Sequence, residues 1–129
     1  MPWVNYHSHS LYCDGKALPE AFVKQAIEKG FPAWGFSSHA PVPFDSKWNM
    51  ASDRFPEYLE ELDLIKNKYS SAIQVYKGLE FDNIEGIWGR RQSGLNTAPL
   101  DYTIGSVHYI GPWPDGSFFC FDGQPEAFF

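Results

Sequence analysis

Two histidines, a cysteine and an aspartate stand close together near the start of the chain, in the stretch YHSHSLYCDGK. His7 and His9 flank one residue, so on an extended backbone their side chains project to the same side, as two ligands of one metal ion require. Imidazole nitrogen suits zinc, iron and manganese, and a nearby carboxylate such as Asp14 adds the charge that holds such a cation. Taken alone, the pair fits solvated strand-end residues equally well, and a lone thiol such as Cys13 is more often a packing residue.

The remaining two histidines and a glutamate occupy similar positions further along the chain. His39 stands in FSSHAP, Glu80 in KGLEF and His108 in IGSVH, each after an apolar run rich in β-forming residues. The chain has four histidines, and all of them occupy such positions. Asp82 is a further available carboxylate. This arrangement favours a metal site built from several strand ends over isolated surface histidines.

Alternating strands and helices are expected to position these residues. Alternation of this kind predicts right-handed βαβ crossovers and a largely parallel sheet, with functional residues at the C-terminal ends of the strands. We therefore expect the four residues His7, His9, Glu80 and His108 to converge, with His39 bordering them farther out. The expected strands are Trp3 to Tyr6, Ala33 to Ser37, Ala72 to Leu79 and Asp101 to Val107; the expected helices are Pro19 to Lys29, Arg54 to Tyr69 and Ile84 to Leu95; a hairpin is expected after His108.

Composition limits the classes of function. The 129 residues fit one domain, and the 18% aromatic content indicates a packed interior. A net charge of −6 argues against nucleic-acid partners. The two distant cysteines do not form the pattern of a disulfide-rich domain, and no apolar stretch is long enough to span a bilayer. We expect a cytoplasmic protein that does not bind a membrane.

The end of the sequence suggests an unfinished fold. The last residues, GQPEAFF, place Pro125 where a helix should begin, four residues before the chain ends. We expect residues 1–129 to form a single domain of the α/β class that is truncated at its C-terminus, like the first half of a β/α barrel.

The ordered motifs HSH, CDG, SSHAP, GLEF and GSVH resemble the first four motifs of the PHP (polymerase and histidinol phosphatase) metallohydrolase family, most closely its histidinol-phosphatase branch. The resemblance covers nearly the whole chain. It implies the N-terminal part of a distorted (β/α)7 barrel with about four βα units present. It also implies up to three divalent ions (Zn, Mn or Fe) and the hydrolysis of histidinol phosphate to histidinol and phosphate in histidine biosynthesis.

The resemblance also assigns roles by position. His7 and His9 would bind the first metal, Glu80 would bridge the first and second, His108 would bind the second, and His39 would hold a third with Asp14. Glu80 and His108 would thus be catalytic, since clustered ions activate a hydroxide that attacks phosphorus. The chain departs from the family in having Ser38 where an aspartate is common, and in lacking the later histidine and Asp-x-His.

Other functions stay open at this point. The chain could be a catalytically incomplete fragment or a metal-binding regulatory domain, or a phosphoesterase acting on another small phosphate ester or a nucleotide. The expected partner is a small-molecule phosphate ester. Exposed strand edges and apolar patches also predict self-association.

Overall fold

A three-stranded parallel sheet forms the centre of the protein. The computed structural model describes residues 2–120. The strand order is β1-β2-β3, so each strand pairs with the next one along the chain, and both pairings are parallel. The register pairs His39 with Glu80 at the C-terminal ends of β1 and β2. The strands are β1 (Ala33–His39), β2 (Gln74–Asp82) and β3 (Tyr102–Ser106).

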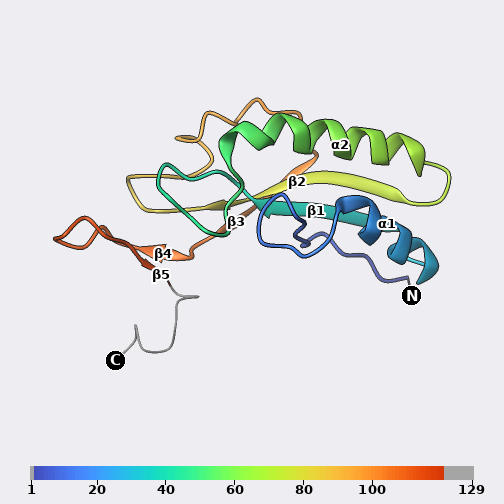
Figure 1. Cartoon of the computed structure of the whole chain (residues 1–129), viewed down its shortest axis with the longest axis horizontal. Helices are drawn as coiled ribbons and strands as arrows, with labels where there is room; N and C mark the ends of the chain where they lie inside the picture. The colour runs from blue at the N-terminus through green and yellow to red at the C-terminus, as the bar shows by residue number, and fades with distance from the viewer. Residues whose placement is uncertain (1, 121–129) are drawn as a thin grey trace.

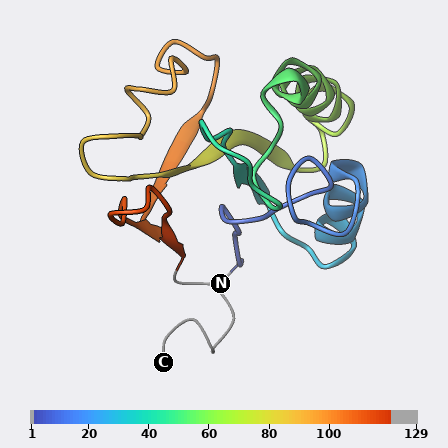
Figure 2. The same cartoon turned by 60° about the vertical axis from the view of Figure 1, so that its left-hand side comes forward.

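Two helices pack side by side on one face of this sheet, as Figures 1 and 2 show. They are α1 (Pro19–Glu28) and α2 (Phe55–Lys68), and a short 3-10 turn, η1 (Ser52–Arg54), precedes α2. A proline stands in the first turn of each helix, where its missing N–H costs no hydrogen bond. Both helices confirm the expected ranges to within two residues.

The hydrophobic core lies between the helices and the sheet. It contains Val23 from α1 and Leu62 from α2, packed against Phe36, Leu79 and Phe81 of the strands. Side chains alternate between the two faces of a strand, so burying Leu79 and Phe81 under the helices directs Glu80 to the opposite face. The apolar residues that form the core therefore also fix the direction of the site carboxylate.

Two expected elements differ from the structure. The helix expected over Ile84 to Leu95 is wrong: this segment forms turns and a single bridge between Ile84 and Trp88. Gly86 and Gly94 adopt positive φ angles of 73° and 72°, which a helix does not allow. The segment Trp3 to Tyr6 runs beside β1, but within the described part of the chain it forms a single isolated parallel bridge, between Asn5 and Trp34, in place of a strand.

A two-stranded hairpin follows β3, as expected. Its strands, β4 (Tyr109–Ile110) and β5 (Phe119–Cys120), pair antiparallel, and Figure 1 shows the hairpin beyond the end of the sheet at which the strands finish. The helix expected to begin at Pro125 lies outside the described residues. Within residues 2–120, no helix combines the length and apolarity needed to cross a membrane.

Candidate metal centre

All six residues predicted to bind metal lie together at the C-terminal end of the sheet. His39 and Glu80 come from the paired strands β1 and β2, and His108 follows β3. His7, His9 and Asp14 come from the segment before α1. Three overlapping groups of ligand atoms, each within 4.8 Å of one another, are formed by His7, His9 and Glu80, by His9, Asp14 and His39, and by His39, Glu80 and His108.

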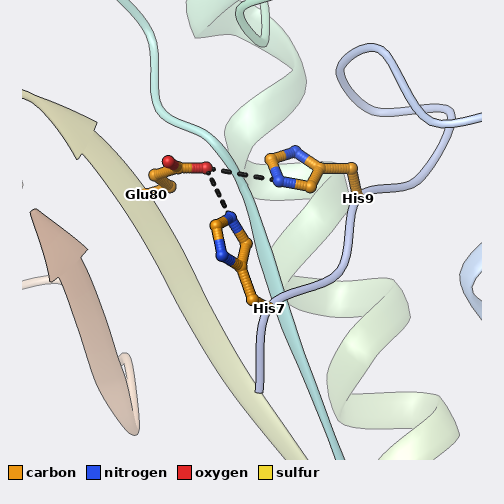
Figure 3. A group of neighbouring side chains, drawn as sticks. All are labelled: His7, His9 and Glu80. Atoms are coloured by element: carbon orange, nitrogen blue, oxygen red, sulfur yellow. Dashed lines mark hydrogen bonds and ion pairs between the residues drawn. The ribbon is translucent and has the colours of Figure 1, made fainter. Parts of the chain in front are cut away.

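Glu80 is at the centre of this cluster. Its Oε2 lies 3.0 Å from Nε2 of His7 and 3.2 Å from Nε2 of His9, the two interactions drawn in Figure 3. The same oxygen lies 3.5 Å from Nδ1 of His39. Oε1 lies 3.7 Å from Nε2 of His108. Because the Glu80 side chain is only 4% exposed, its charge acts on these imidazoles with little screening by water.

Asp14 supplies a second carboxylate on the side of the cluster that faces solvent. Its Oδ1 lies 3.4 Å from Nδ1 of His9, and its Oδ2 lies 3.6 Å from Nε2 of His39. His9 and His39 each use one ring nitrogen toward Asp14 and the other toward Glu80. His39 is therefore central and its side chain is only 10% exposed, so the expectation that it sits farther out is wrong.

A pair of residues outside the predicted set orients His108. Nδ1 of His108 lies 2.5 Å from Oδ1 of Asp82, and this contact turns Nε2 of the same ring toward Glu80. Nδ2 of Asn49 donates in turn to Oδ2 of Asp82 at 3.1 Å. The sequence signals Asp82 through its i, i+2 spacing from Glu80, which puts both carboxylates on one face of the strand. No comparable pattern marks Asn49, which lies in the loop after β1.

The pKa values of two central residues are shifted in opposite directions. Burial alone would raise the pKa of Glu80, but the hydrogen bonds from His9 and His7 outweigh it and lower that pKa to about 2. Hydrogen bonds to Cys13 and then Glu80 raise the pKa of His9 to about 10 despite burial. At neutral pH the metal-free site therefore holds an ionised glutamate and a protonated His9. A metal ion must displace that proton.

The pKa shifts of His39 and Cys13 are consistent with a site that binds a cation. Burial, followed by the nearby charge of His9, lowers the pKa of His39, so its ring is neutral and able to bind metal. Nδ1 of His39 is buried and makes no hydrogen bond to any group of residues 2–120. Burial would raise the pKa of Cys13, but its hydrogen bond to His9 lowers it. Imidazole nitrogens around shared carboxylates are the donor set of zinc, iron and manganese, so the residues fit such an ion.

The fold and site define a class: a parallel α/β protein whose strand ends gather histidines around a central glutamate. The PHP domain model matches residues 5–127, and the chain belongs to this family. A crystal structure from Listeria monocytogenes shares the fold, with a TM-score of 0.83 at 23% identity, and covers 98% of this chain and 52% of that one. The expected α/β class and partial barrel are thus confirmed.

Histidinol phosphatases are among the proteins similar to this chain. A protein named probable histidinol-phosphatase from Deinococcus radiodurans is 31% identical over 110 residues, covering 83% of this chain and 42% of that protein. A crystal structure of the Lactococcus lactis histidinol phosphate phosphatase, in complex with Zn, L-histidinol and phosphate, is 30% identical with a TM-score of 0.69. It covers 84% of this chain and 41% of that one. The chain spans 40–49% of the length of the curated relatives it matches.

Proposed function

We propose that this chain carries part of the active site of a divalent-metal-dependent phosphatase that hydrolyses histidinol phosphate to histidinol and phosphate, in the cytoplasm and in histidine biosynthesis. The observation that carries the proposal is the convergence of four histidines on the two oxygens of one buried glutamate. Similarity to the Lactococcus lactis phosphatase, whose structure contains Zn, L-histidinol and phosphate, supports the substrate.

The geometry supports a role for each of the six residues. His7 and His9 would bind one ion together with Glu80, His108 would bind a second with Glu80, and His39 with Asp14 would bind a third. Glu80, which belongs to two of the three groups, would be a ligand of both of the first two ions. When bound, zinc, manganese or iron would supply Lewis-acid stabilisation of a phosphoryl group and activation of a water.

This chain's own residues prepare the site for that chemistry. Asp82 holds the Nδ1 proton of His108, so that Nε2 faces the centre. The ionised Glu80 supplies negative charge where cations would sit, and Asp14 adds a second carboxylate beside His9 and His39. A protein nucleophile is not needed in this reaction.

The test combines metal uptake with phosphate release. We would measure both for the 129-residue chain and for the complete product of its coding region, with Mn²⁺, Zn²⁺ and Fe²⁺. We expect the 129-residue chain to take up metal with negligible turnover, and the complete product to hydrolyse histidinol phosphate if it supplies the further ligands. Misplaced or missing ligands lower the rate of hydrolysis by orders of magnitude. The 129-residue chain can therefore bind metal and still show negligible turnover.

The decisive variant is Glu80→Gln, with Glu60→Gln, an exposed glutamate of α2, as its matched control. Glu80→Gln should abolish turnover and weaken metal uptake by at least about a hundredfold, because it removes the carboxylate shared by two groups. Full activity in Glu80→Gln would exclude the bridging role. Metal uptake without turnover in every form would instead favour a metal-binding regulatory domain, and turnover of other phosphate esters alone would change the substrate.

A further inference from the structure

The segment that carries His7 and His9 has few strand-type hydrogen bonds. Gly35 N–H donates to the carbonyl of Asn5 at 2.7 Å, and Ser37 N–H donates to the carbonyl of Ser8 at 2.9 Å. Tyr6 and His7 lie between these two contacts. His7 is also the most exposed of the six candidate ligands, with 54% of its side chain accessible. The His7 N–H donates to Oδ1 of the nearby Asn5 at 2.9 Å rather than to β1, so a regular ladder does not fix the backbone at Tyr6 and His7.

Tyr102 provides a direct contact to this backbone from the far strand. Tyr102 begins β3 and pairs with Gly78 of β2. Its hydroxyl reaches the carbonyl of Tyr6 at 2.6 Å and the carbonyl of Phe36 in β1 at 3.0 Å. One side chain thus crosses the whole sheet, on the face opposite the helices. Burial raises the pKa of Tyr102, which keeps the hydroxyl protonated and able to donate.

Two glycines make this crossing sterically feasible. A Cβ at Gly78 would lie 2.5 Å from a ring carbon of Tyr102, and a Cβ at Gly35 would lie 2.5 Å from its hydroxyl oxygen. Neither distance is compatible with a side chain at these positions. Glycine is required at these two positions because there is no room for a side chain. The backbone conformation does not require it, since neither residue has a positive φ. The sequence therefore provides a side-chain-free path that leads from β3 to the Tyr6 carbonyl.

We infer that Tyr102 is a positioning residue for the metal centre: its hydroxyl holds the Tyr6–His7 backbone so that Nε2 of His7 faces Glu80. This inference rests on the proposed metal-binding function. The contact lies one residue before His7, whose Nε2 is 3.0 Å from Oε2 of Glu80. Because metal affinity depends on ligands held in place before binding, loss of this contact acts mainly through His7.

The test uses Tyr102→Phe, which removes only the hydroxyl, and Zn²⁺ alone as the probe. We expect about tenfold weaker Zn²⁺ uptake by calorimetry, the lower end of the loss seen when a residue supporting a ligand is removed. Tyr76→Phe is the matched control, because within residues 2–120 the Tyr76 hydroxyl donates its hydrogen bond to the side chain of Gln74, away from the Tyr6 carbonyl. It should bind Zn²⁺ like the wild type.

A double-mutant cycle with His7→Ala separates positioning from general stability. If Tyr102 acts through His7, adding Tyr102→Phe to His7→Ala should not weaken Zn²⁺ uptake further. An equal loss with and without His7, or no loss at all, would overturn the inference.

Hydrogen exchange in the metal-free protein gives an independent readout. Tyr102→Phe should speed exchange of the Gly35 and Ser37 amides, which donate to residues 5 and 8, relative to Tyr76→Phe. Unchanged exchange would contradict the positioning role. If the wild type takes up no Zn²⁺, the proposed function fails, while this experiment still decides whether Tyr102 holds the segment.

Discussion

At the scale of single residues, the site depends on charges that compensate one another. Glu80 is buried yet ionised, because the imidazoles of His7 and His9 donate hydrogen bonds to it. Asp82 is buried as well, and it is bonded to His108 and Asn49. Removing one member of such a set leaves its partners buried without compensation, so single substitutions should have measurable effects.

Acid should weaken the metal-free protein through Glu80. The pKa of Glu80 is lowered from 4.5 to about 2 in the folded protein, so its contribution to stability is fully present above about 4.5 and is lost as the pH falls toward 2. We therefore expect the wild type to be more stable than Glu80→Gln at pH 7, with the difference shrinking between pH 4.5 and 2. Denaturant unfolding across this range measures the difference. A constant difference down to pH 2 would contradict the assigned charge.

Replacing Asp82 should weaken metal binding without removing a proposed ligand. Asp82→Asn takes away the negative charge that holds Nδ1 of His108, so we expect about 10- to 100-fold weaker uptake of Zn²⁺. Asp45→Asn, at an exposed position in the loop after β1, is the matched control and should have no effect. Calorimetric titration measures both variants. Equal affinity in Asp82→Asn and the wild type would show that His108 does not need this contact.

At the scale of elements, the buried faces of the helices pack against the sheet whose strand ends carry the site. Leu62 of α2 is fully buried against the sheet, whereas Leu64, two residues on, is 64% exposed. We expect Leu62→Ala to lower the free energy of unfolding by about 2–5 kcal/mol and Leu64→Ala to change it little. Denaturant unfolding of the two variants provides the comparison. Similar losses in both would mean that α2 packs differently from the structure.

The sequence predicts most helices and strands because the spacing of their apolar residues reflects which side chains are buried. Helices α1 and α2 carry apolar residues at helical spacing, and the core strands are apolar runs, so both kinds of element were expected close to their observed ranges. The helix predicted over Ile84 to Leu95 does not form, because the glycines of this segment favour turns over a helix. The isolated bridge pairs the backbone of Asn5 with that of Trp34, a residue far along the chain, and no local pattern encodes such a pairing.

The site could be predicted more completely than the fold around it. Histidine is scarce in this chain, and each of its four copies follows an apolar run, so position alone predicts that His7, His9, His39 and His108 lie at one end of the sheet. Position could not predict the central place of His39, which depends on its parallel register with Glu80. Asn49 and Tyr102 were not identified because their contacts join residues 33 and 96 positions apart, respectively.

At the scale of the whole molecule, both described helices cover the same face of the sheet (Figure 2). The opposite face carries Tyr6, Tyr76 and Tyr102, which with Asp101 line a groove of about 460 Å³. Within the described residues, β3 pairs only with β2 in the parallel sheet. Trp3 and Val107 are 80% and 58% exposed, respectively. Exposed apolar side chains near unpaired strand edges favour association.

We therefore expect the 129-residue chain to self-associate as its concentration rises. Val107→Lys, directly after the last residue of β3, should reduce association, because a charge beside an edge strand opposes edge pairing. Leu64→Lys replaces a similarly exposed residue on α2, away from the edge, and should have a smaller effect. Light scattering over a range of concentrations measures both. A monodisperse monomer at every concentration would contradict this expectation.

The overlap among the three ligand groups limits how ions can fill them. Glu80 has two oxygens and can serve two ions at once, but a neutral imidazole has only one nitrogen lone pair to offer. His9 and His39 each belong to two groups, so the group with Asp14 competes with both of its neighbours for ligands. Binding within residues 2–120 should therefore show negative cooperativity, with two ions taken up readily and a third only at a cost to the first two.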